Sequence, residues 1–194
     1  ETDTMICHQP GCNLRINSGI APLNTMLEKG VTVAIGTDSV GLNDDNDLFQ
    51  EMRLAQKLHR VPGVTSSYPT SHQILRMATS NGARATFFGD QVGTLEVGKR
   101  ADLALIDLGR ITEPYLHPDT NIVDALVYRG KGLDVDTVMV EGKVLLQNRK
   151  FTTLNKEDII SQLKKSLDGP ISPNIARRAE LGRRLLPYIR DFYE

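Results

Sequence analysis

Cysteine, long apolar runs and an excess of one charge are all scarce in this chain of 194 residues. The two cysteines, Cys7 and Cys12, make no disulfide framework, so we expect free thiols in a reducing cytoplasm. No apolar run approaches the roughly 20 residues that a membrane span requires. A formal net charge of -1 gives no electrostatic reason to expect nucleic acid or an anionic membrane as a partner. These absences predict a cytoplasmic protein without a nucleic-acid or membrane partner.

The chain also lacks a signal peptide at its start, and Glu1 is not a natural first residue. We therefore expect that an upstream segment has been removed by processing, cloning or clipping. The remaining length still suffices to bury a sizeable core, as one domain or as two small ones.

Histidines are few, and their spacing matches no local metal-binding motif of the H-x-H or H-E-x-x-H type. His59 falls in the last turn of a predicted helix, where an interaction with the helix dipole is the simplest interpretation. His72 and His117 are expected at the surface. His8 ends a predicted strand, and it is therefore the one histidine with a claim on a site at that strand's end.

Residues 1–88 alternate between strand-like and helix-like segments. Residues 5–7 form a short apolar run, and residues 31–35 form a β-branched run typical of a strand buried on both faces. Apolar residues at helical spacing predict three helices, at residues 20–29, 47–60 and 71–80. The alternation predicts parallel strands joined by crossover helices.

Residues 89–150 are expected to form a separate, strand-rich β domain. The segment "VGTLEVGKRADLALIDL" contains two short strand-like pieces, and "TVMVEGKVLLQNRK" predicts a hairpin with its turn at residues 141–142. Within "GKRADL", Asp102 falls in a tight turn, where we expect backbone donors to hold its carboxylate. Residues 151–194 are expected to be helical, and the acidic residues interleaved in the basic last helix favour a solvated face.

Four carboxylates follow the apolar run at residues 31–35. Asp38 comes at the predicted carboxyl end of this strand, which is the end where parallel α/β folds place their sites. A lone carboxylate there is more often a helix cap or a loop contact. Asp44, Asp45 and Asp47 are most simply a loop followed by an N-cap. The residues alone therefore leave Asp38 between a structural and a functional role.

Several motifs occur in the order seen in the amidohydrolase superfamily: "CHQPGCNLRINSGIAP", "GVTVAIGTDS" with "LFQEMRLAQKLHR", "ATSNGARATFF" and "VGTLEVGKRADLALIDL". Over about residues 5–150 the chain resembles the branch that contains N-heterocycle deaminases and chlorohydrolases. The resemblance implies an α/β fold in three parts. Residues 1–88 would be the C-terminal part of a TIM-like (β/α)8 barrel, residues 89–150 a small β-sandwich-type domain, and residues 151–194 C-terminal helices.

The resemblance also implies a metal-dependent hydrolase that cleaves a non-peptide C–N bond with a metal-activated water. Asp38 matches the aspartate that ends the eighth barrel strand, which contacts a zinc or iron ion and takes a proton from the attacking water. Residues 5–7 would be the seventh strand and residues 31–35 the eighth. Four residues near these strand ends are expected to contact the substrate: His8, Ser39, Asn43 and Asp44.

The chain departs from this pattern because it supplies only the last two barrel strands. The H-x-H pair, the other metal-binding histidines and the usual catalytic glutamate are absent, and a catalytic zinc takes about three protein ligands. We therefore expect this chain alone to be inactive and to bind no zinc stoichiometrically. Its expected partner is the missing N-terminal barrel portion, in an enzyme that is a homo-oligomer when complete.

The preferred function is deamination of an amino-substituted heterocycle of purine, pyrimidine, pterin or triazine type. Two alternatives remain open from the sequence. The first is a chlorohydrolase or cyclic-amide hydrolase of the same family, in which the same attack expels a different leaving group. The second is a non-catalytic structural or interaction fragment.

Overall fold

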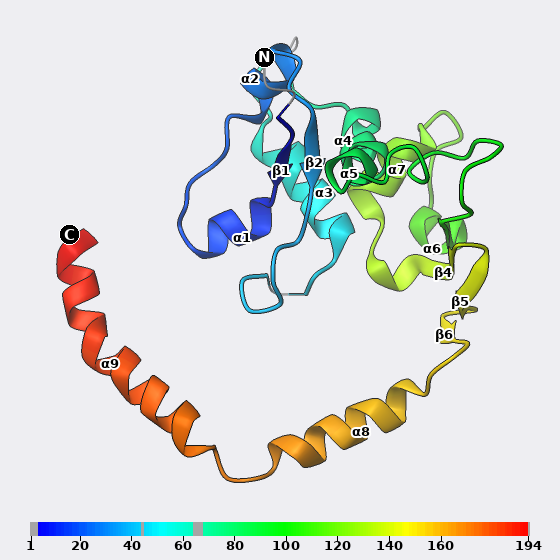
Figure 1. The fold of residues 1–194 in the computed structure, drawn as a ribbon. Coiled ribbons are helices and arrows are strands. Elements are labelled where there is room, and N and C mark those ends of the chain that lie inside the picture. Colours follow the sequence, from blue (N-terminus) through cyan, green and yellow to red (C-terminus); the bar gives the residue numbers. More distant parts are fainter. Residues whose placement is uncertain (1–3, 44, 64–67, 194) are drawn as a thin grey trace. The chain divides into compact units, whose positions relative to one another are not determined.

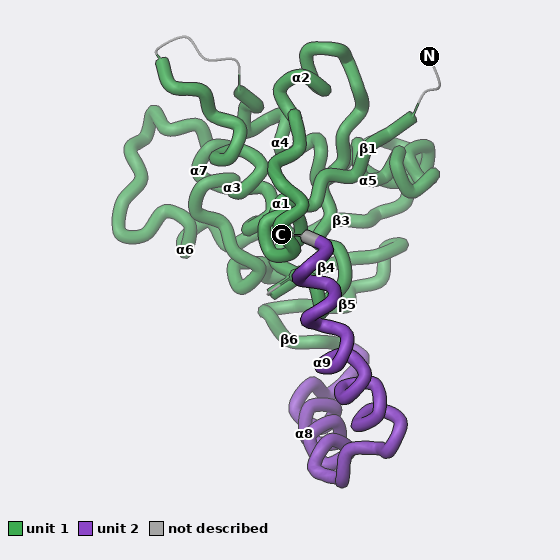
Figure 2. The backbone as a smooth tube through the Cα atoms, turned by 90° about the vertical axis from the view of Figure 1, so that its left-hand side faces the viewer, with its two compact units in different colours: residues 1–152 green, residues 153–194 purple. Residues whose placement is uncertain are grey.

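The structure is a computed structural model, and it describes residues 4–43, 45–63 and 68–193. Asp44, one of the expected substrate contacts, lies outside the described residues. The chain divides into two compact units, residues 1–152 and 153–194, which are coloured separately in Figure 2. The first unit contains residues on both sides of residue 88. The domain boundary expected there stays a prediction.

The first unit opens with two short parallel strands that lie side by side in Figure 1. Strand β1, Ile6–His8, pairs in register with strand β2, Val33–Ile35. All three β2 residues are buried, as the apolar run predicts. The parallel pairing confirms the strand–helix–strand interpretation of this part of the sequence.

Two helices connect these strands, and only the second follows from the sequence pattern. Helix α2, Leu23–Glu28, is the predicted one. Helix α1, Pro10–Arg15, is unexpected, since its Pro-Gly start suggests a stop signal. Proline is tolerated in the first turn of a helix because the N–H that it lacks has no partner there.

Helices α3, Leu48–Leu58, and α4, Ser71–Ala78, begin where the sequence places them. Asp47 caps α3 by accepting a hydrogen bond at Oδ1 from the Phe49 N–H, at 2.9 Å. After α4, however, the chain continues directly into helix α5, Ser80–Ala85, where the sequence suggested a helix end.

The hydrophobic core of the first unit lies between β2 and helices α2, α3, α4 and α7. Helix α7, Ile122–Arg129, follows the cap residue Asn121, whose side chain accepts a hydrogen bond from the Val123 N–H. It contributes Val127 to the core, although it belongs to the part of the sequence expected to be strand-rich. The fully or nearly fully buried members of the core are Leu23, Val33, Ile35, Met52, Ala55, Ile74, Met77 and Val127.

The first unit also contains an antiparallel sheet with the strand order β3-β4-β5-β6. Its strands, in chain order, are Leu103–Ile106, Val135–Val140, Lys143–Gln147 and Lys150–Phe151. The β4–β5 hairpin confirms the predicted turn. A short helix, α6, Leu108–Thr112, and a 3-10 turn, η1, Gly132–Asp134, flank this sheet.

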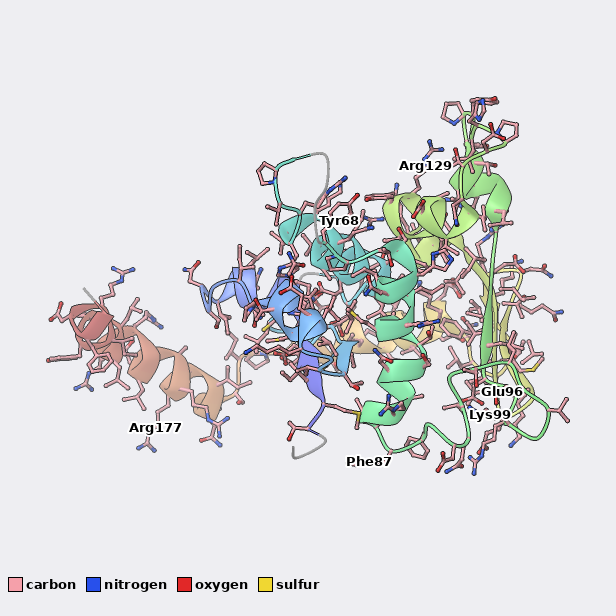
Figure 3. The ribbon with its side chains drawn as sticks, turned by 90° about the horizontal axis from the view of Figure 1, so that it is seen from above. Tyr68, Phe87, Glu96, Lys99, Arg129 and Arg177 are labelled. Carbon is pink, nitrogen blue, oxygen red and sulfur yellow. The ribbon has the colours of Figure 1, made fainter. Side chains whose placement is uncertain are left out.

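Two details near β3 test the sequence analysis directly. Asp102 accepts a hydrogen bond at Oδ1 from the Glu141 N–H at 2.8 Å, which confirms that a backbone donor holds this carboxylate. The strand-like piece before residue 98 is a loop in the structure rather than a strand. Figure 3 shows Glu96 and Lys99 close together in this loop, where their charged groups lie 3.8 Å apart.

The second unit contains the two predicted helices. Helix α8, Lys156–Leu167, begins at Asn155, whose side chain accepts hydrogen bonds from the N–H groups of Glu157 and Asp158. Helix α9, Pro173–Tyr193, carries exposed basic side chains such as Arg177, labelled in Figure 3. Among the described residues, no helix combines the length and the apolar character needed to cross a bilayer.

Candidate active site

Asp38 stands three residues beyond the end of β2, in a backbone conformation that few residues adopt. Its φ of 63° lies in the left-handed region, which costs most side chains free energy and which aspartate tolerates better than most. The strand is buried and Asp38 is exposed. A buried apolar strand is therefore followed by an exposed carboxylate in a left-handed conformation, and such conformations concentrate at functional sites.

Two hydrogen bonds fix the orientation of the Asp38 carboxylate. Oδ2 accepts from the Cys12 thiol, with Sγ at 3.0 Å, and Oδ1 accepts from the Ser39 N–H at 2.7 Å. Cys12 lies in α1, immediately after β1, so the bond joins the segments that follow the two parallel strands. Both oxygens keep further acceptor capacity, because a carboxylate offers about four lone-pair sites.

These contacts also set the protonation states of the pair. The Cys12 hydrogen bond, followed by the Ser39 N–H, lowers the pKa of Asp38 below its ordinary value. The same hydrogen bond, together with burial, raises the pKa of the Cys12 thiol. Asp38 is therefore an ionised acceptor near neutral pH, and Cys12 keeps the proton that it donates.

His8 ends β1 and is buried against a second histidine. Its Nε2 lies 3.2 Å from Nε2 of His59, and the two ring centroids are 5.3 Å apart. Burial, with a smaller contribution from His59, lowers the pKa of His8 to about 4. Burial also lowers the pKa of His59, the residue at the C-terminal end of α3, and the interaction with the helix dipole expected of it stays a prediction.

Asn43 lies in the loop after Asp38, and its amide forms hydrogen bonds within the protein. Nδ2 donates to Glu51 Oε1 at 2.9 Å, and Oδ1 accepts from the Asn46 N–H at 2.9 Å. The side chain is buried, whereas Ser39 is exposed beside Asp38. The substrate contacts expected of His8, Ser39 and Asn43 stay predictions.

Two residues at this site, Cys12 and Glu51, are not among the site residues expected from the sequence. Cys12 contacts Asp38 across 26 positions of sequence, and Glu51 accepts from the Gly11 N–H at 2.8 Å across 40 positions. A signal for Glu51 does exist, because it lies three residues after Leu48 and four before Ala55, on the buried face of α3. A carboxylate on that face requires an internal partner.

A complete metal centre requires more ligands than the described residues bring together. Within residues 4–43, 45–63 and 68–193, no group of three or more His, Cys, Asp or Glu side chains could hold a metal ion. The exposed, ionised carboxylate of Asp38 is suited to be one ligand of an ion, since aspartate oxygen is an ordinary zinc ligand. The described residues do not form a complete metal site, and further ligands would have to come from elsewhere.

One surface hollow of about 650 Å³ lies apart from this carboxylate, between the start of α3 and residues 131–135. Asp47 and Gly132 are among the residues that line it, and the Gly132 N–H donates to Asp47 Oδ2 at 2.9 Å. Asp38 does not line the hollow. The candidate site therefore rests on the chemistry around Asp38, and the depth of a cavity plays no part in it.

The described unit has an α/β fold, in which an exposed carboxylate follows a buried parallel strand. Comparison with known proteins identifies the family to which it belongs. The profile of the amidohydrolase family matches residues 1–145. The chain therefore belongs to the amidohydrolase family.

The chain is similar to curated proteins that are named as deaminases. It is 44% identical over 165 residues to 5-methylthioadenosine/S-adenosylhomocysteine deaminase of Moorella thermoacetica, with 84% of this chain and 37% of that protein covered. It is 40% identical over 162 residues to 5'-deoxyadenosine deaminase of Methanosarcina acetivorans, with 84% and 36% covered. The chain spans little more than a third of the length of these relatives.

Solved structures show the same partial match. An adenosine deaminase from Xanthomonas campestris with bound zinc superposes with a TM-score of 0.77 at 32% identity, over 84% of this chain and 37% of that one. Atrazine chlorohydrolase from Arthrobacter aurescens, complexed with zinc, gives a TM-score of 0.73 at 29% identity, over 83% and 35%. The α/β fold of the described unit is therefore the fold of part of these hydrolases.

Proposed function

We propose that this chain is the C-terminal portion of a metal-dependent amidohydrolase that deaminates an adenosine-type nucleoside or a related amino-substituted N-heterocycle. The observation that carries the proposal is the Asp38 carboxylate, ionised and oriented by Cys12 and Ser39 at the carboxyl end of a buried parallel strand. Family membership and the deaminase relatives support it.

In the complete protein, β1 and β2 would be the seventh and eighth strands of a TIM-like barrel. Their parallel pairing and the burial of β2 are what barrel strands require, since side chains fill the interior and helices cover the outside. The antiparallel sheet β3–β6 would form part of a small β-sandwich-type domain beside the barrel. The N-terminal barrel portion would supply the remaining strands.

Within this arrangement Asp38 has two tasks. One carboxylate oxygen would contact a divalent ion, zinc or iron, which supplies an activated water when bound. The other would accept the proton of the attacking water, and its lowered pKa keeps it in the form that can accept a proton. Cys12 donates to one of these oxygens and the Ser39 N–H to the other. These hydrogen bonds would keep the carboxylate oriented during the proton transfer.

The chlorohydrolase alternative has one observation in its favour, which is the similarity to a zinc-bound atrazine chlorohydrolase. Curated relatives that are 35–44% identical over more than 80% of this chain are named as deaminases of 5-methylthioadenosine and S-adenosylhomocysteine or of 5'-deoxyadenosine, and they favour loss of ammonia. Expulsion of chloride or opening of a cyclic amide would use the same acceptor, Asp38.

The test is an assay of the intact protein with 5'-methylthioadenosine and with a chlorotriazine, measuring release of ammonia and of chloride. We expect ammonia from the nucleoside, with metal in the intact protein by elemental analysis. Residues 1–194 alone are expected to give neither turnover nor stoichiometric zinc. Chloride release without ammonia release would replace the deaminase proposal by its alternative, and zinc with turnover in the isolated chain would contradict the proposed division of the site.

A further inference from the structure

Glu51 is a buried carboxylate that no step of the proposed reaction uses. It has no exposed surface, and it lies in α3, the helix that follows the loop after Asp38. Burial of a carboxylate is costly unless hydrogen bonds compensate it. Here both oxygens are used, and the two donors come from different segments of the site.

The first donor belongs to the segment after β1. The Gly11 N–H donates to Glu51 Oε2 at 2.8 Å, and Gly11 immediately precedes Cys12, the donor to Asp38. A side chain at position 11 would not fit beside this bond, because its Cβ would overlap Glu51 Oε1. The glycine therefore permits the close approach of the backbone to the carboxylate.

The second donor belongs to the segment after β2. Asn43 donates from Nδ2 to Glu51 Oε1 at 2.9 Å, while its Oδ1 accepts from the Asn46 N–H. These partners fix the orientation of the amide, since a carboxylate only accepts and an N–H only donates. Asn43 in turn holds the loop that begins at Asp38.

From this geometry we propose that Glu51 is a positioning residue for Asp38, and that it acts by joining the first turn of α1, at Gly11 and Cys12, to the loop at Asn43. It touches neither the reacting atoms nor a substrate. Loss of the bridge frees both segments, and the Cys12 thiol and the Asp38 carboxylate then lose their fixed geometry. The proposal deepens the proposed function and rests on it, and it also assigns Asn43 to this bridge.

The test uses the intact protein with 5'-methylthioadenosine as probe. Glu51→Gln keeps size but leaves one acceptor for two donors, so one donor then faces the new NH2 group. We expect kcat to fall about tenfold or more with KM changed less than about twofold, because a misplacement near 1 Å can cost about 100-fold in rate. The double variant Glu51→Gln/Asn43→Asp exchanges the amide and the carboxylate, restores every hydrogen bond of the bridge and should recover most of kcat.

Asp134→Asn is the matched control, because Asp134 is also a buried carboxylate that holds a turn, and it bonds Arg110 and the Lys131 N–H. It should lower stability and leave kcat unchanged. An equal fall of kcat in Glu51→Gln and Asp134→Asn would overturn the proposal. So would a double variant no more active than Glu51→Gln.

A second measurement does not depend on activity. Cys12 is 2% exposed, and its alkylation by iodoacetamide, followed by mass spectrometry, reports whether its segment stays in place. Glu51→Gln should speed alkylation at least about tenfold, the population change that about 1.4 kcal/mol produces, and the double variant should reverse it. If Glu51→Gln does not fold, Gly11→Ala replaces it in this test. The Cβ of the alanine would displace the Glu51 carboxylate, which this variant keeps. Unchanged alkylation in the folded variant would contradict the bridge, whereas a protein with no deaminase activity but with these alkylation rates would contradict the proposed function alone.

Discussion

Asp38 and Asp134 are two carboxylates of one unit, and the structure holds them in opposite ways. Asp134 is buried, and its oxygens accept from the Arg110 Nε and the Lys131 N–H at 2.8 and 2.9 Å. Asp38 is exposed, adopts a left-handed backbone conformation and accepts from a thiol and the neighbouring N–H. Asp134 is buried and paired with a cation, whereas Asp38 is oriented and left open, as the proposed proton acceptor would have to be.

His8 extends this comparison, because it is a buried group beside the strand that precedes Asp38. The folded state is most stable when its ring is neutral. Its pKa is about 4 in the folded protein and 6.5 when unperturbed, so between these values the unfolded state binds more protons. This group therefore costs no stability above pH 6.5, and stability falls as the pH drops from 6.5 to 4 and levels off below that. The loss across this range is about 3 kcal/mol.

We expect His8→Asn to remove that dependence, measured as the urea unfolding free energy of the intact protein from pH 7 to pH 4. The variant's curve should be flatter than the wild-type curve across this range. His72→Asn, at an exposed position, should run parallel to the wild type. Parallel curves for His8→Asn would mean that burial against His59 does not hold the ring neutral.

Asp134→Asn tests the structural side of the comparison. The amide has one oxygen in place of two, so one of the two hydrogen bonds is lost, and Arg110 loses its charged partner. The unfolding free energy should therefore fall by about 2 kcal/mol. Chemical denaturation of the intact protein measures the loss. A variant as stable as the wild type would show that the enclosed carboxylate contributes nothing to the fold.

Much of the fold could be predicted from local patterns in the sequence. The continuous apolar run gives β2, Asp47 and Asn155 mark helix starts, and the Glu141-Gly142 pair marks the hairpin turn. These features depend on residues near one another in the chain. Helix α1 was missed because a Pro-Gly pair serves both as a stop signal and as a helix start.

The site was less predictable, because its contacts join distant segments. The strand pattern and the family resemblance identify Asp38, but nothing near Cys12 in the sequence indicates that its thiol meets a carboxylate 26 positions away. The bridge from Glu51 spans 40 positions to Gly11. The pairing of His8 with His59 likewise brings together residues 51 positions apart, which no local pattern specifies.

The most direct test of the account is a paired measurement on Asp38→Asn in the intact protein, with kcat and unfolding free energy determined on the same samples and metal content checked. An amide is nearly isosteric with the carboxylate but cannot accept the proton of the attacking water. We predict a fall in kcat of about 10²–10⁴, the usual cost of losing a general base, with the fold's stability unchanged. A variant that kept more than about a tenth of the wild-type kcat, or that lost stability as Asp134→Asn should, would contradict the assignment of Asp38 as proton acceptor.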